Sequence, residues 1–230
     1  MIPRAFERAI QARAGAGGAP ALSLRELCDA AAEATSLRAS IVLTTEARHQ
    51  AAIAASDGVA AIEDLQFTLG EGPGVDAQAD GRAVLVGDLA TRTTRWAQFV
   101  PAARALGVES VFAFPLQLGA IRAGVLSLYA GRVDPFEPHQ LGELATLAVL
   151  VTDALLAMQS GAEAEELAWS LAHAADHRAV VHQATGMVSV QLSCSAQDAL
   201  ARIRARAFAE GVSVDDVARR IVDRRLRFER

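Results

Sequence analysis

Apolar residues recur at every third or fourth position across residues 139–158, which predicts a long amphipathic helix. The residues that recur are Leu141, Leu144, Leu147, Val151, Leu155 and Met158. A similar stripe follows at Leu167, Leu171, Ala174, Val181 and Ala184. The pattern therefore indicates a long helix between two parts of the chain, which either packs on the preceding domain or forms the stalk of a homodimer.

Before this helix, β-type runs alternate with helical runs, which predicts an α+β domain with an antiparallel sheet flanked by helices. Strands are expected at residues 39–45, 51–56, 83–88, 111–118 and 125–129, and helices at 4–13, 22–36, 58–69 and 96–106. Ser23 is a candidate cap of the second helix. The last two strands are rich in β-branched and aromatic residues, so we expect them to form a central antiparallel pair.

After the long helix, three further helical runs predict an all-α three-helix bundle. These runs cover residues 178–190, 196–209 and 214–228, with Ser195 and Ser213 as candidate caps. The expected organisation is an N-terminal helix and linker (1–21), the α+β domain (22–157), a helical linker (158–169) and the bundle (170–228). Small residues at five positions of the bundle are expected where helices pack closely: Ala184, Gly186, Ala199, Ala207 and Ala218.

Composition places the chain among soluble globular proteins, with 52% hydrophobic and 21% charged residues. The net charge is −5, but arginines outnumber acids from Arg202 to the end, and the chain has no lysine. A local excess of arginine suits the recognition of phosphate groups. No window approaches the roughly 18 apolar residues needed to span a bilayer, and the two distant cysteines, Cys28 and Cys194, suggest buried thiols, so we expect a cytoplasmic protein without disulfides.

Two short motifs contain residue types that bind phosphate or metal ions. The glycines of Gly70–Gly74 could hold a phosphate, but Pro73 removes a donor and no Lys-Ser/Thr follows, so a turn in a pocket wall is the other interpretation. His173 and His177 share a helical face, as in zinc sites, yet no acidic ligand follows. Neither a nucleophile elbow nor a spaced pair of acids is found. The sequence predicts no catalytic residue, no metal site and no cofactor.

Two family resemblances account for most of the chain. Residues 22–156 resemble a GAF domain of the actinobacterial type, on Gln66, the run Gly-Glu-Gly-Pro at 70–73, Trp96, and the strand sequences at 110–116 and 124–129. Residues 163–228 resemble an ANTAR domain, the RNA-binding module of transcription antiterminators. The second match rests on three spaced segments: Arg178-x-Val-Val-x-Gln-Ala-x-Gly186, Ala199 to Ala207, and Val214 to Val222.

The resemblance implies a homodimeric antitermination regulator that senses a small effector in its GAF domain and binds stem-loop RNA through paired ANTAR domains. Arginine and glutamine side chains would contact RNA phosphates and loop bases, at Arg178, Gln183, Arg204, Arg206 and Arg220. The effector pocket is expected to include Phe67, Val75, Phe112, Phe114 and Leu126. Because side chains alternate along a strand, a register error of one residue would reverse the strand part of that set.

The chain also departs from both patterns. Many ANTAR domains carry Lys and Met where this chain has Thr185 and Ser189, and the glycine-rich GAF segment often ends in Cys where Gly74 stands. These departures motivate an alternative, a GAF sensor and dimerisation module that acts through a protein partner instead of RNA. A third hypothesis is an enzyme, because some GAF-fold proteins reduce methionine sulfoxide with clustered cysteines, but the GAF region contains only Cys28.

Overall fold

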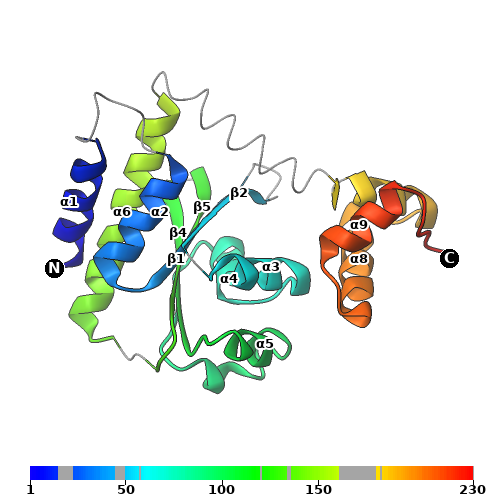
Figure 1. Ribbon diagram of the computed structural model, residues 1–230, viewed down its shortest axis with the longest axis horizontal. Coiled ribbons are helices and arrows are strands. Elements are labelled where there is room, and N and C mark those ends of the chain that lie inside the picture. The colour runs from blue at the N-terminus through cyan, green and yellow to red at the C-terminus, as the bar shows by residue number, and fades with distance from the viewer. Residues whose placement is uncertain are drawn as a thin grey trace.

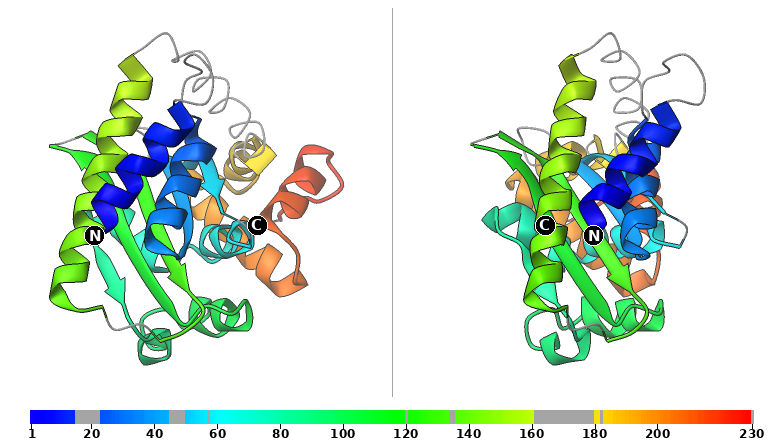
Figure 2. Two further views of the ribbon diagram at one scale, coloured as in Figure 1. Left: turned by 60° about the vertical axis from the view of Figure 1, so that its left-hand side comes forward. Right: turned by 90° about the vertical axis from the view of Figure 1, so that its left-hand side faces the viewer.

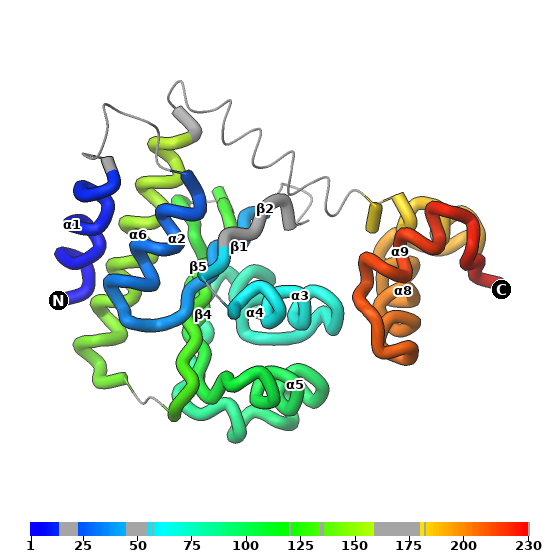
Figure 3. The backbone as a smooth tube through the Cα atoms, in the orientation of Figure 1, coloured from blue at the N-terminus to red at the C-terminus, as the bar shows by residue number. Residues whose placement is uncertain are grey.

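The computed structural model describes residues 1–14, 23–44, 50–56, 58–119, 121–133, 136–160, 180–181 and 183–229. An α+β domain and a helical bundle follow one another along the chain, as the colour gradient of the backbone tube shows (Figure 3). The fold class predicted from the sequence is confirmed.

Five antiparallel strands form one sheet with the order β2-β1-β5-β4-β3. Its strands are β1 (Arg38–Thr44), β2 (Gln50–Ala55), β3 (Val84–Val86), β4 (Ser110–Leu118) and β5 (Ile121–Ala130). β4 and β5 form the expected hairpin, and β5 also pairs with β1, for example at Ser40 opposite Ser127. The strand that closes the hairpin therefore lies at the centre of the sheet.

Helices cover both faces of this sheet (Figures 1 and 2). One face carries α1 (Ile2–Ala14), α2 (Leu24–Thr35) and α6 (Pro138–Ser160), and the other carries α3 (Ala60–Leu69), α4 (Pro73–Asp80), a 3-10 turn (Leu89–Arg92) and α5 (Phe99–Ala105). Ser23 caps α2 as expected, because its hydroxyl accepts a bond from the Glu26 amide at 3.2 Å while the Glu26 carboxylate accepts one from the Ser23 amide. The Ser23 amide and hydroxyl lower the pKa of Glu26.

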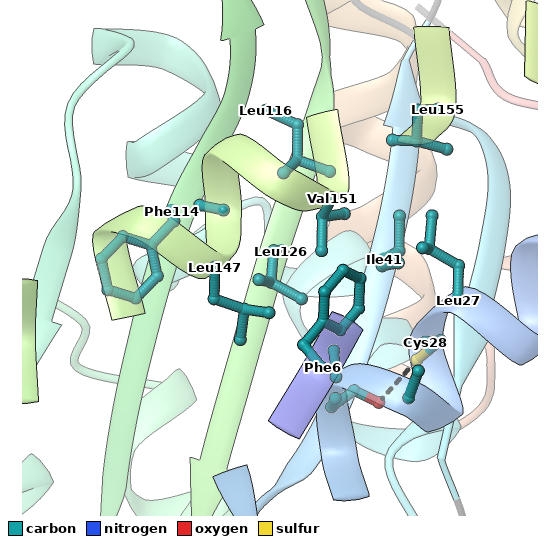
Figure 4. Close-up of a cluster of buried hydrophobic side chains, with 14 of the residues drawn as sticks. Phe6, Leu27, Cys28, Ile41, Phe114, Leu116, Leu126, Leu147, Val151 and Leu155 are labelled. Atoms are coloured by element: carbon teal, nitrogen blue, oxygen red, sulfur yellow. Dashed lines mark hydrogen bonds between the residues drawn. The ribbon is translucent and has the colours of Figure 1, made fainter. Parts of the chain in front are cut away.

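The larger core lies between the sheet and α1, α2 and α6 (Figure 4). Phe114 and Leu126 lie in it with Leu147 and Val151 of α6, and Phe112 belongs to the same core. Because strand side chains alternate, the intervening residues of β4 and β5 face α3 and α4 instead. Phe112, Phe114 and Leu126, which were expected in an effector pocket, thus lie on the face of the sheet that α1, α2 and α6 cover.

The long helix α6 passes, by length and composition alone, as a membrane-spanning helix over Pro138–Met158, contrary to the expectation from the sequence. Its apolar stripe is used inside the protein: Leu144, Leu147, Val151 and Leu155 are fully buried against the sheet. A core helix of a soluble domain meets the same criteria. We therefore assign α6 a packing role in the α+β domain.

The C-terminal bundle consists of the helical residues 183–192, α8 (Ala196–Glu210) and α9 (Val214–Val222). Ser195 and Ser213 cap α8 and α9, as the sequence predicted. The four alanines expected at helix contacts are fully buried: Ala184, Ala199, Ala207 and Ala218. Gly186 is exposed, contrary to expectation, because two residues along a helix turn it about 200° away from the buried position 184.

One α-helix was not predicted, and two boundaries differ from those predicted by four residues or more. α4 was missed, because its start lies in the glycine-rich run, where Pro73 occupies a position that favours helix initiation. β5 begins at Ile121 and not at Val125, so the hairpin connection is tighter. α9 ends at Val222 and not at Phe228, because Arg224 adopts a left-handed conformation with φ of 60°.

Candidate functional site

A buried polar cluster lies between the sheet and α3. Glu63 of α3 is 2% exposed and accepts hydrogen bonds from the hydroxyls of Ser40 (2.5 Å) and Tyr129. The Gln66 amide donates to Glu63 Oε2 at 3.2 Å and to the Tyr129 hydroxyl oxygen at 3.0 Å. Burial and the neighbouring Glu63 carboxylate raise the pKa of Tyr129 well above its usual range. The cluster joins the centre of the sheet to α3.

The glycine-rich segment closes around Gln66. The Gly74 amide donates to Gln66 Oε1 at 2.8 Å, and a Cβ at Gly72 would lie 2.5 Å from the same oxygen. Gly72 also has φ of 137°, a conformation that side-chain-bearing residues rarely adopt. Gly70–Gly74 is therefore shaped to hold a side chain of its own domain, which favours the pocket-wall interpretation over the phosphate loop.

A cavity of about 10 Å³ lies beside this cluster. Its lining comes from β1, β5, α3 and α4: Val42, Glu63, Gln66, Gly74, Val75, Gln78, Val125 and Ser127. A volume of this size admits about one water molecule. Of the five residues expected in the effector pocket, Val75 lines the cavity, Phe112, Phe114 and Leu126 lie on the opposite face of the sheet, and Phe67 packs elsewhere.

Phe67 connects the two domains. It projects from α3 and packs against the core of the C-terminal bundle, and the Arg204 guanidinium carbon lies 5.2 Å from the centre of its ring. A Cβ added at Gly70 would lie 2.8 Å from Arg204 Nη1, so the glycine leaves room for this arginine. Arg204, expected at an RNA interface, is thus half-buried against the α+β domain.

Two other expected RNA contacts share one acid. Arg206 and Arg220 both pair with Glu210, and all three lie at the surface. Hydrogen bonds from Arg220 and then Arg206 lower the pKa of Glu210. The structure therefore brings Arg206 and Arg220 together into one surface group. Gln183 is exposed on the first bundle helix, and Arg178 lies outside the described residues.

The two departures from the ANTAR pattern have structural partners. Thr185 is 8% exposed and donates to the Val181 carbonyl at 2.7 Å. Ser189 donates to the Cys194 carbonyl at 2.6 Å. Both side chains satisfy backbone groups of the bundle itself, so these substitutions bear on packing more than on a surface contact.

Thiol and metal chemistry have little support in the part of the chain that the structure describes. Cys28 is fully buried, its thiol donates to the Ala39 carbonyl at 3.3 Å (Figure 4), and burial raises its pKa to about 12. A thiol of this kind is a poor nucleophile at neutral pH. No group of three metal-binding side chains occurs among the described residues, and His173 and His177 lie outside them.

Sequence reasoning missed the roles of Glu63, Ser40 and Tyr129. A signal was present, because Glu63 and Gln66 are three residues apart on one helix and so share a face. An acid on the inner face of a helix that packs on a sheet needs buried donors, and the serines and tyrosine of the adjoining strands were the available ones. The spacing alone did not show which face of α3 is the inner one.

Comparison with known proteins gives two family matches in order along the chain. Residues 23–156 match the GAF domain and residues 170–222 match the ANTAR domain. The search of curated protein sequences found no match.

Solved structures similar to this chain include GAF domains and an enzyme. The GAF domain of an Acinetobacter phosphoenolpyruvate-protein phosphotransferase is 17% identical, with 70% of this chain and 96% of that chain covered and a TM-score of 0.49. The free methionine-R-sulfoxide reductase from Neisseria meningitidis is 16% identical, with 69% and 90% covered and a TM-score of 0.46.

Proposed function

Because the chain belongs to the GAF domain family and carries an ANTAR domain after its GAF domain, we propose that it is a ligand-responsive regulator that binds stem-loop RNA and acts by transcription antitermination. The two domains are regulatory modules, which supports a regulator of this kind. The observation that carries the proposal is the contact of Phe67 with Arg204, because it links the sensor domain to an arginine of the RNA-binding module.

RNA binds through the arginine-bearing surface of the bundle in this proposal. Arg206 and Arg220 lie together at Glu210, and Gln183 is exposed on a neighbouring helix. Surface ion pairs contribute little to stability, so a phosphate can replace Glu210 as the partner of these arginines at small cost. Arg204 joins the interface when it leaves Phe67, and Arg178 belongs to it by resemblance.

The effector enters between the sheet and the α3–α4 layer, where Val75, Gln78 and Ser127 line the small cavity. Since about 10 Å³ cannot hold an organic ligand, binding requires α3 or α4 to move away from the sheet. The polar lining favours an effector with hydrogen-bonding groups that replace the bonds now made by Gln66 and Glu63.

The movement reaches the RNA-binding module through α3. Glu63 and Gln66 on its inner face contact the cavity, and Phe67 on its outer side contacts Arg204. A displacement of α3 at the cavity therefore changes the environment of Arg204 directly. We expect the chain to act as a cytoplasmic homodimer.

A binding assay with hairpin RNA tests the proposal. The probe is a pool of hairpins with one constant stem and a randomised loop, compared with single-stranded random RNA of equal length. We expect preferential hairpin binding that weakens with salt and falls about tenfold in an Arg206→Ala, Arg220→Ala double variant. The matched control is an Arg82→Ala, Arg92→Ala double variant, which removes two exposed arginines of the GAF domain. Equal binding of the two RNA pools would refute the function.

A second candidate function is a module that docks a protein partner. The observation that favours it is the exposure of large apolar side chains on the bundle, where Phe208 is 58% and Val190 is 82% exposed. An intact dimer that binds a protein partner but no hairpin RNA, with the partner binding lost in Phe208→Ser, would favour this candidate over the first.

A further inference from the structure

The bundle contains a cavity of about 320 Å³, at the small end of the range of ligand pockets. Its lining residues are Met187, Gln191, Ile221, Arg224, Leu226 and Arg227. Half of them come from the segment after α9, which lies beyond residue 222, where the ANTAR match ends. None of the expected site residues that the structure describes lines this cavity.

The segment that forms one side of the cavity is firmly placed. Arg224 is in the left-handed conformation, and the amides of Arg225 and Leu226 donate to the Arg220 carbonyl at 2.8 and 2.9 Å. This turn reverses the chain, so that Leu226 and Phe228 pack on the bundle core. The Phe228 amide then donates to Gln191 Oε1 at 3.0 Å, which ties the segment to the first bundle helix.

The polar groups of the lining are hydrogen-bond donors. Because Gln191 uses its oxygen for Phe228, its amide nitrogen is the group left to meet a ligand. Arg224 and Arg227 are exposed and contribute two guanidinium groups, and no acidic residue stands among the described residues that line the cavity. Met187, Ile221 and Leu226 add an apolar wall. The ligand that fits carries acceptors, negative charge and a flat apolar face.

We propose that this cavity binds one unpaired nucleotide of the RNA. Its base lies against Met187, Ile221 and Leu226, the Gln191 amide donates to an acceptor on the base edge, and the two arginines pair with the adjoining phosphates. Unstacked loop bases are the parts of RNA that proteins read in this way. The proposal rests on the proposed RNA-binding function and adds the place where a loop base is recognised.

The hydrogen-bond donor in the cavity lining should bind some bases more tightly than others. Guanine and uracil present carbonyl oxygens as acceptors, whereas adenine presents an amino donor beside its N7 acceptor. The Gln191 amide nitrogen can donate to one of these carbonyls, but it faces the adenine amino group donor to donor. The cavity therefore prefers guanine and uracil to adenine.

Methyl NMR on the full chain tests the site directly. The chain has three methionines, Met1, Met158 and Met187, so ¹³C-methyl-methionine labelling places one reporter in the cavity wall and two outside it. Guanosine and uridine monophosphate, added at constant ionic strength, should shift the Met187 methyl saturably at millimolar concentrations, and adenosine monophosphate should bind several-fold more weakly. A silent Met187, or an equal response to inorganic phosphate alone, would overturn the proposal.

Matched variants separate the cavity from general charge. In Gln191→Glu the carboxylate still accepts the Phe228 amide but offers the ligand an acceptor, so we expect roughly tenfold weaker binding of guanosine monophosphate with an unchanged melting temperature. Arg227→Ala should weaken it similarly. Arg225→Ala is the control, because Arg225 pairs with Asp223 at 3.9 Å and does not line the cavity. Equal losses in Arg225→Ala and Arg227→Ala would overturn the site.

The mononucleotide assay is independent of hairpin binding. A saturable Met187 response in a chain that binds no hairpin would support the site and contradict the regulatory function. Hairpin binding that survives Gln191→Glu, together with a silent Met187, would contradict the site and leave the regulatory function in place.

Discussion

Two acids, one in each domain, gather hydrogen-bond donors in opposite environments. Glu63 is buried in the GAF domain with Ser40, Tyr129 and Gln66, whereas Glu210 lies at the surface of the bundle with Arg206 and Arg220. Leaving a buried carboxylate without its donors, or buried donors without their carboxylate, lowers the free energy of unfolding substantially. Ion pairs at the surface contribute little to stability and exchange partners easily. The cluster in the GAF domain is therefore held in one arrangement, whereas the surface ion pairs of the bundle can exchange partners at small cost.

Removing the buried acid should have the largest effect. Glu63→Ala leaves the Ser40, Tyr129 and Gln66 donors buried without their acceptor, so we expect the free energy of unfolding to fall by about 3 kcal/mol in urea denaturation. Glu109→Ala, which removes a surface partner of Arg104 in the same domain, is the control and should be close to wild type. A loss below about 1 kcal/mol for Glu63→Ala would mean that the cluster is not a rigid unit.

High pH should lower the stability of the same cluster by ionising Tyr129 in the unfolded state. The raised pKa keeps this phenol neutral in the folded state, while the unfolded state ionises near 10.0. The folded state then holds the extra proton, so stability is unaffected below pH 10 and falls above it by about 1.4 kcal/mol per pH unit. Tyr129 is the chain's single tyrosine, so phenolate absorbance reports it alone. Phenolate that forms near pH 10 while circular dichroism remains native would contradict the prediction.

The contact between the domains should be intermediate in strength. Phe67→Ala removes the ring beneath Arg204, and an interaction of this type is worth about 1 kcal/mol, so we expect hairpin RNA to bind about fivefold more tightly without effector. Fluorescence anisotropy measures the change. Phe67→Leu keeps the packing against the bundle and loses the aromatic face, so it distinguishes release of Arg204 from a general loosening. Unchanged or weaker binding in both variants would separate α3 from the control of RNA binding.

Releasing the surface arginines should have the smallest effect. Glu210→Gln frees Arg206 and Arg220 from a charged partner, and we expect hairpin binding to tighten about two- to threefold at low salt and by less at high salt. The melting temperature should stay close to wild type because the pairs are exposed. Asp216→Asn, at an acid of the neighbouring helix α9, serves as the control. Tighter binding in both variants would show that net charge, and not this pair, is responsible.

The sequence predicted the order of elements well because periodicity and caps are local properties. Ser23, Ser195 and Ser213 cap the helices they were expected to cap, since a cap needs only residues three positions away. α4 was not predicted, because the glycine and proline residues at its start are also typical of a turn. The choice of sheet face was not predictable, since Phe112 and Val111 are both apolar and only the packing of α6 decides which one faces it.

The candidate sites were harder to predict than the fold because they depend on contacts between distant segments. Arg204 lies beside Phe67, and Gln191 beside Phe228, only once the chain has folded. The expected RNA contacts were predicted from the family pattern, which gives residue types and their spacing. The pattern does not show which acidic residue pairs with these arginines in the fold. The hydrophobic pattern of the bundle did not indicate that the residues after Val222 reverse direction and line a cavity.

The central position of β5 in the sheet also determines the order in which the two domains can fold during translation. β1 cannot complete its pairing until β5 has left the ribosome, and the apolar face stays open until α6 follows. All of this precedes α8 and α9 in the chain. The nascent protein therefore completes its GAF domain before its ANTAR domain emerges, so a ligand of the GAF domain that is present during translation would meet a finished domain while the ANTAR domain is still being made.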